Sequence, residues 1–271
     1  MTSLSVNVNK IATLRNARGG DIPNLIQTAQ DIEGFGAQGI TIHPRPDERH
    51  IRYQDAHDLK KVVKTELNIE GNPVPKFIEL VLAVKPDQVT FVPDAEDAIT
   101  SNAGWDTIKH QSFLTEVIQE CKNNGVRTSI FLDPDPKQVD GAKATGTDRI
   151  ELYTEAYASG FPKNPETAIA PYVEAATRAN EFEIGLNAGH DLVSVHFQII
   201  PSTRRDSIKP VVRPNGSHGG KLGGNDSIPL GYTGHVPMES HHHFPMRLEG
   251  VLLIRNNVID HWGESVRYDR I

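Results

Sequence analysis

Short apolar segments alternate with longer amphipathic segments along most of this chain, up to about residue 190. In the longer segments apolar residues recur at helical spacing, as Leu25, Ala29 and Ile32 do. The segments expected to be strands are 4–8, 39–43, 67–71, 88–93, 127–133, 148–154 and 183–190. The segments expected to be helices are 24–36, 55–66, 75–86, 105–125, 136–146 and 165–180. This alternation predicts right-handed βαβ units and a parallel sheet.

The number of repeats favours a closed barrel over a doubly wound sheet. Seven units follow one another without the glycine fingerprint of a dinucleotide-binding fold. The sequence therefore predicts a (β/α)₈ TIM barrel whose eighth strand and helix are missing or replaced. Residues 1–192 would form this domain of seven βα units.

The pattern breaks at residue 193, and residues 193–271 form an atypical tail rich in Gly, Pro and His. Seven of the 12 histidines lie in it, and no helical period is sustained. We expect the tail to be either disordered or the product of a change of reading frame, although residues 250–259 could form a strand. An open barrel exposes two strand edges, which predicts poor solubility or weak activity unless the tail supplies a substitute strand.

Composition excludes several classes of function. The formal net charge of -7 argues against binding to nucleic acid or to an anionic membrane. The single cysteine, Cys121, cannot form a disulfide within the chain and more often represents core packing than a nucleophile. No apolar run approaches the ~20 residues of a membrane span, and the N-terminus lacks the apolar region of a signal peptide. These features predict a cytoplasmic location.

Polar residues follow the predicted strands, and in a parallel barrel the carboxyl ends of the strands meet at one mouth. Glu70 and Glu151 lie in apolar strands, where an unpartnered carboxylate is costly. They could form structural ion pairs with Arg18 or Arg45, but proton transfer is the favoured interpretation. His43 and His190 at the same rim support acid–base chemistry near neutral pH.

The basic residues have an anion-binding and a structural interpretation. Arg18 and Arg45 fall in short loops at the predicted mouth, which favours contact with an anion. Arg15 and Arg49 are expected to be structural. The histidines at 241–243 have no carboxylate at a helpful spacing, so no metal site is predicted.

Six motifs in order resemble the pyridoxine 5′-phosphate synthase family over residues 4–192. They are VNVNKIATLRNARGG, GITIHPRPDERHI, LNIEG, VTFVPD with ITSNAGWD, RIELYTEAYA and GLNAGHDL. The resemblance implies a TIM barrel, a homo-octamer, no metal and no organic cofactor. It also implies condensation of 1-deoxy-D-xylulose 5-phosphate with 3-amino-2-oxopropyl phosphate to pyridoxine 5′-phosphate, phosphate and water.

The resemblance assigns roles to the residues at the rim. The catalytic residues would be His43 and Glu70 as proton acceptors, His190 as proton donor and Glu151 as a stabiliser of transition-state charge. The substrate-binding residues would be Asn7 and Arg18 for the aminoketone phosphate, and Arg45, His50 and Thr100 for deoxyxylulose phosphate. Asn9 and Lys10 stand where Asp-His is commoner, and Asp191 stands at a substrate-contact position that is Gly in other members.

One part of the family pattern is not found. The family's eighth strand ends in a Gly-His pair whose loop binds the aminoketone phosphate, whereas Gly234-His235 follows no apolar strand. Two alternatives therefore stay open beside the synthase. One is another phosphosugar lyase or isomerase, and the other is an inactive or substrate-binding remnant.

Overall fold

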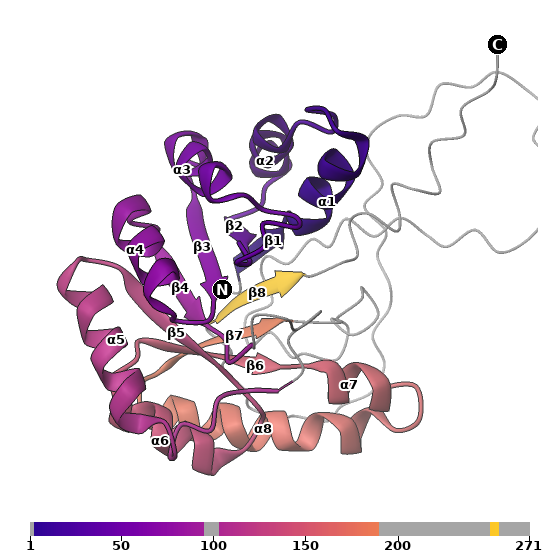
Figure 1. Cartoon of the computed structure of the whole chain (residues 1–271). Helices are drawn as coiled ribbons and strands as arrows, with labels where there is room; N and C mark the ends of the chain where they lie inside the picture. Colours follow the sequence, from indigo (N-terminus) through magenta and orange to yellow (C-terminus); the bar gives the residue numbers. More distant parts are fainter. Residues whose placement is uncertain (1–2, 95–102, 190–249, 255–271) are drawn as a thin grey trace, which may run out of the picture.

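The computed structural model of the chain describes residues 3–94, 103–189 and 250–254, and these form one closed parallel barrel (Figure 1). Eight strands follow one another around the barrel in chain order. They are β1 (Ser3–Asn7), β2 (Gly39–Ile42), β3 (Glu66–Gly71), β4 (Gln88–Phe91), β5 (Arg127–Leu132), β6 (Arg149–Tyr153), β7 (Gly185–Gly189) and β8 (Gly250–Ile254). The predicted fold class is confirmed.

The described helices lie on the outside of the barrel, as Figure 1 shows. They are α1 (Asn9–Arg18), α2 (Leu25–Gly34), α3 (Tyr53–Val62), α4 (Pro75–Val84), α5 (Gln111–Asn123), α6 (Pro136–Thr145), α7 (Glu155–Gly160) and α8 (Pro165–Glu181). Two of them, α1 and α7, were not predicted. In α1 only Ala12 and Arg15 are buried, so the segment carries little apolar periodicity.

Local signals explain where several helices begin. The side chains of Asn24, Asp135 and Asn164 each accept a hydrogen bond from a backbone N–H in the first turn of α2, α6 and α8. Proline at the first turn of α4, α6 and α8 costs no intrahelical hydrogen bond, because those N–H groups would have no partner in the helix. The expected helix 105–125 begins only at Gln111.

The eighth strand comes from the C-terminal tail. β8 pairs in parallel with β1, where Ser3 lies opposite Val251, and with β7, where Leu186 lies opposite Gly250. The yellow arrow of β8 fills the place between these two strands in Figure 1. The tail therefore supplies the substitute strand, in the segment singled out for that possibility. The other tail residues lie outside the described residues, so the domain division at residue 193 stays a prediction.

Side chains alternate between two faces of each strand. On the outer face Ile40, Ile42, Leu67 and Ile69 are fully buried in the main hydrophobic core, which the helices cover. The burial of this layer supplies the dominant favourable term in folding.

The inner face of the barrel is polar. Ser5 Oγ lies 2.8 Å from Thr41 Oγ1, and Asn68 Oδ1 accepts a hydrogen bond from Thr90 Oγ1 at 3.0 Å. On the opposite side of the barrel Arg149 Nε donates to Asn187 Oδ1 at 2.8 Å. The same alternation, continued two residues beyond Asn68, directs Glu70 inward.

Candidate active site

His43 and Glu70 lie together at the carboxyl ends of β2 and β3. The Nδ1 atom of His43 is 3.8 Å from Oε2 of Glu70. Glu70 is completely buried and His43 is 5% exposed. A buried carboxylate close to an imidazole places two proton-accepting groups in one site, an arrangement suited to acid–base catalysis.

Asn7 at the end of β1 and Asn9 at the start of α1 hold the backbone that carries His43. Asn7 Oδ1 accepts a hydrogen bond from Asn9 N at 2.9 Å, and Asn9 Oδ1 accepts one from His43 N at 2.9 Å. The Nδ2 atom of Asn7 is buried and has no hydrogen-bond partner among the described residues. Asn9 thus has a structural contact in addition to its predicted substrate contact, while the Asn7 amide has a donor left for a ligand.

Glu151 is also completely buried, in β6. In the sheet register it lies opposite Phe131 of β5 and Asn187 of β7. Its neighbours Ile150 and Leu152 belong to the outer hydrophobic core, so the alternation of the strand directs Glu151 toward the barrel interior. Both carboxylates singled out from the sequence are therefore buried in the barrel wall.

Arg45 is engaged by a carboxylate that was not predicted as a site residue. Its Nη2 atom lies 2.8 Å from Oδ2 of Asp94, and both side chains are about 5% exposed. Asn72 Nδ2 donates to the backbone oxygen of Asp94 at 2.7 Å. These residues line a small pocket together with His43 and Tyr53. The only signal for Asp94 in the sequence is its place just after strand 88–93.

His50 is held as a neutral side chain close to His43. The two rings meet edge to face with centroids 6.5 Å apart. The pKa of His50 is lowered to about 4, chiefly by burial and also by the positive charges of Arg45, Arg49 and Lys10, while Asp47 opposes them. His50 Nδ1 accepts a hydrogen bond from Ile51 N at 2.9 Å, so the proton of the neutral ring sits on Nε2. His50 can then donate a hydrogen bond to an anion but brings no charge of its own.

The remaining predicted residues divide into two groups. Lys10 and Arg18 are exposed on α1, one at its first turn and one at its last. Thr100, His190 and Asp191 lie outside the described residues, as do the histidines at 241–243. In the described part of the chain, no group of His, Cys, Asp or Glu side chains is arranged to hold a metal ion. No helix there is long and apolar enough to cross a membrane.

A family model described as "Pyridoxal phosphate biosynthesis protein PdxJ" matches residues 4–205. The chain belongs to the PdxJ family. The match includes every site residue predicted from the sequence, from Asn7 to Asp191, but it ends before β8. The resemblance drawn from the six motifs is confirmed.

Curated relatives agree with the PdxJ assignment. The pyridoxine 5′-phosphate synthase of Flavobacterium johnsoniae is 68% identical over 192 residues, which cover 71% of this chain and 81% of the relative. The synthase of Christiangramia forsetii is 65% identical over the same shares of both chains. That of Bacteroides thetaiotaomicron is 60% identical over 197 residues, covering 73% of this chain and 83% of the relative.

Proposed function

We propose that this chain is a pyridoxine 5′-phosphate synthase, which condenses 1-deoxy-D-xylulose 5-phosphate with 3-amino-2-oxopropyl phosphate. Membership of the PdxJ family makes it an enzyme of vitamin B6 biosynthesis. The observation that carries the proposal is the buried pair of His43 and Glu70 at the mouth of the barrel, in a segment that matches the family throughout. The products are pyridoxine 5′-phosphate, inorganic phosphate and water.

The reaction needs repeated proton transfers, which Glu70 and the two histidines His43 and His190 perform. The amine attacks the ketone of deoxyxylulose phosphate, and loss of water leaves an imine. His43 and Glu70 accept protons during imine formation, enolisation and ring closure, and His190 donates a proton to the oxygen that departs when inorganic phosphate or water is eliminated. Glu151 stabilises positive charge that develops in the transition state, because a buried carboxylate acts through a low local dielectric.

The two phosphates are bound on different sides of this acid–base centre. Asn7 and Arg18 bind the aminoketone phosphate, and the free Nδ2 donor of Asn7 supports that role. Arg45, His50 and Thr100 bind deoxyxylulose phosphate, with Lys10 adding positive charge nearby. His50 contributes as a hydrogen-bond donor through Nε2 and not as a cation, since its pKa is about 4. Asn9 and Asp191 complete the substrate contacts.

The remaining properties of the enzyme follow the family resemblance. We place it in the cytoplasm as a homo-octamer. It requires no metal or organic cofactor and binds neither nucleic acid nor a membrane. Its only partners are the two phosphorylated substrates and further copies of the chain.

The direct test mixes both substrates with the purified protein and follows pyridoxine 5′-phosphate by its absorbance. Formation of the product that requires both substrates supports the proposal. Calorimetry that shows binding of deoxyxylulose phosphate but not of the aminoketone, with no product, would instead identify a substrate-binding remnant. Turnover of a different phosphosugar without the amine would identify a lyase or isomerase.

A further inference from the structure

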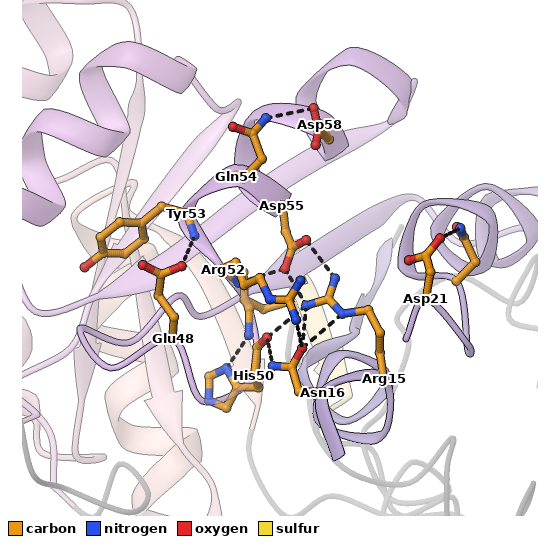
Figure 2. A network of polar contacts seen from close by, with 12 residues as sticks. Arg15, Asn16, Asp21, Glu48, His50, Arg52, Tyr53, Gln54, Asp55 and Asp58 are labelled. Carbon is orange, nitrogen blue, oxygen red and sulfur yellow. Dashed lines mark hydrogen bonds and ion pairs between the residues drawn. The ribbon is translucent and has the colours of Figure 1, made fainter. Parts of the chain in front are cut away.

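A closed polar network joins α1 to the loop between β2 and α3 (Figure 2). Arg15 is 4% exposed, and its Nη1 and Nη2 atoms lie 2.7 and 2.9 Å from the two carboxylate oxygens of Asp55. Asn16 Oδ1 accepts hydrogen bonds from Arg15 Nε at 3.1 Å and from Arg52 Nη2 at 3.0 Å. Asp55 Oδ2 also accepts from the backbone N–H of Arg52 at 2.7 Å and so caps α3.

The network converges on one backbone atom, the carbonyl oxygen of His50. Asn16 Nδ2 donates to it at 2.8 Å and Arg15 Nη2 donates to it at 3.2 Å. Asn16 Nδ2 also lies 3.2 Å from the carbonyl oxygen of Arg49. Figure 2 shows both side chains reaching from α1 toward this turn, with the His50 ring on the other side of the backbone. Two donors on one carbonyl fix the position of that peptide group.

The loop needs such an anchor for two reasons. Glu48 has a φ of 52°, a conformation that costs energy in a residue other than glycine and persists only where the surroundings impose it. The polar ring of His50 is half-buried and has lost part of its water, so without an anchor the loop would gain by turning the ring toward solvent. The His50 ring takes its own hydrogen bond from the next residue, Ile51, so its orientation depends on the backbone.

We propose that Arg15, Asn16 and Asp55 are positioning residues that hold the His50 backbone so that its ring faces the phosphate of the ketose substrate. This inference rests on the proposed function for the identity of that substrate. None of the three residues needs to touch the substrate. They act on the substrate only by fixing the His50 carbonyl. Their loss should therefore weaken the affinity for the phosphate of the ketose and leave the rate of the chemical step unchanged.

The sharpest variant is Asn16→Asp, which keeps the acceptor for both arginines but removes the donor to the His50 carbonyl. We expect the KM for deoxyxylulose phosphate to rise about 5- to 20-fold, the effect of losing one or two hydrogen bonds that orient a ligand group. The kcat and the KM for the aminoketone phosphate should stay within about twofold of the wild-type values. Arg15→Lys keeps the charge but loses the guanidinium group that binds Asp55 through two N–H groups. It should likewise raise the KM for deoxyxylulose phosphate and leave the kcat and the KM for the aminoketone phosphate unchanged.

Two control variants separate positioning from charge and from general stability. Gln54→Glu adds the same negative charge on the exposed first turn of α3 without touching the His50 carbonyl. Lys60→Gln removes the 2.9 Å ion pair with Asp87 near the other end of α3. Both should leave the KM for deoxyxylulose phosphate within about twofold. A fall in thermal stability for Asn16→Asp and Arg15→Lys with unchanged KM values would overturn the proposal.

A second readout does not depend on turnover. In the wild-type protein the NMR titration of the His50 ring should report a pKa near 4, and in Arg15→Lys it should move toward 6.5 as the ring leaves its buried site. The signal is assigned by its loss in His50→Asn. An unshifted titration in Arg15→Lys would contradict the proposal even if the wild-type protein made no pyridoxine phosphate. A synthase assay without product would contradict only the proposed function.

Discussion

The Nδ1 atom of His43 stands 3.8 Å from Oε2 of Glu70, in a place that solvent hardly reaches. The separation is too long for a hydrogen bond but short enough for strong electrostatic coupling in a poorly solvated site. Catalytic contacts are often loose without substrate and tighten when it binds. One residue comes from the end of β2 and the other from β3, so the parallel pairing of these two strands brings the groups together.

Replacing Glu70 with Gln should lower kcat for pyridoxine phosphate formation about 10²- to 10⁴-fold, since the amide cannot accept a proton. The side chain keeps its size, so the protein should stay folded. Steady-state assays with both substrates and circular dichroism measure the two effects. The exposed Glu116 of α5 offers a matched control, because Glu116→Gln makes the same change far from the barrel mouth. Activity of Glu70→Gln near the control would rule out a proton-transfer role.

Asp94→Asn should lower the free energy of unfolding in the absence of phosphate. It should also make the melting temperature depend more strongly on added phosphate. The buried Arg45 guanidinium loses the carboxylate 2.8 Å away, which typically costs about 3 kcal/mol of unfolding free energy. Inorganic phosphate can replace that charge, so millimolar phosphate should raise the melting temperature of Asp94→Asn more than that of the wild type. Asp140→Asn removes an exposed ion pair with Arg178 and should change neither quantity appreciably. If phosphate raised the melting temperature equally in the wild type, Asp94→Asn and Asp140→Asn, Arg45 would not bind the anion.

The stability of the folded protein should depend on the titration of His50. Its folded pKa is about 4, below the ordinary histidine value of 6.5, so the unfolded chain binds the proton more tightly. The loss of stability caused by this difference is absent above pH 7 and grows as the pH falls from 6.5 toward 4. Between pH 7.5 and 5 the free energy of unfolding should fall by roughly 1–2 kcal/mol on this account.

The matched variant for this titration is His50→Asn, whose side-chain oxygen can still accept from the backbone N–H of Ile51. Urea unfolding at the two pH values should show a smaller loss of stability in this variant than in the wild type. An identical loss in both proteins would assign the pH dependence to other groups.

Removing β8 should open the barrel between β1 and β7. A chain that ends at residue 249 loses the parallel partner of both strands and leaves two unpaired edges, which favour association between molecules. The matched control ends at residue 254 and keeps the strand. We expect a lower urea midpoint and larger species by size-exclusion chromatography for the shorter chain only. Indistinguishable behaviour of the two chains would mean that β8 does not close the barrel in solution.

The sequence by itself determined the fold class and the order of the rim residues. Short apolar segments and segments with apolar residues at helical spacing are local properties of the sequence. They predict strands and helices whatever tertiary contacts these segments make. Glu70 and Glu151 could be singled out because a carboxylate in an apolar strand is costly at any position of a parallel sheet. Membership of the family was visible in the same way, through short motifs that keep their order along the chain.

Only the tertiary structure decided which residues meet. The apolar run at 250–259 indicated a possible strand, but its use as β8 depends on the free energy of satisfying the open edges of β1 and β7, which the local pattern does not encode. The pairing of Arg45 with Asp94 joins residues 49 positions apart. The neutral state of His50 results from burial among Arg45, Arg49 and Lys10, so it is a property of the assembled site and not of the histidine itself.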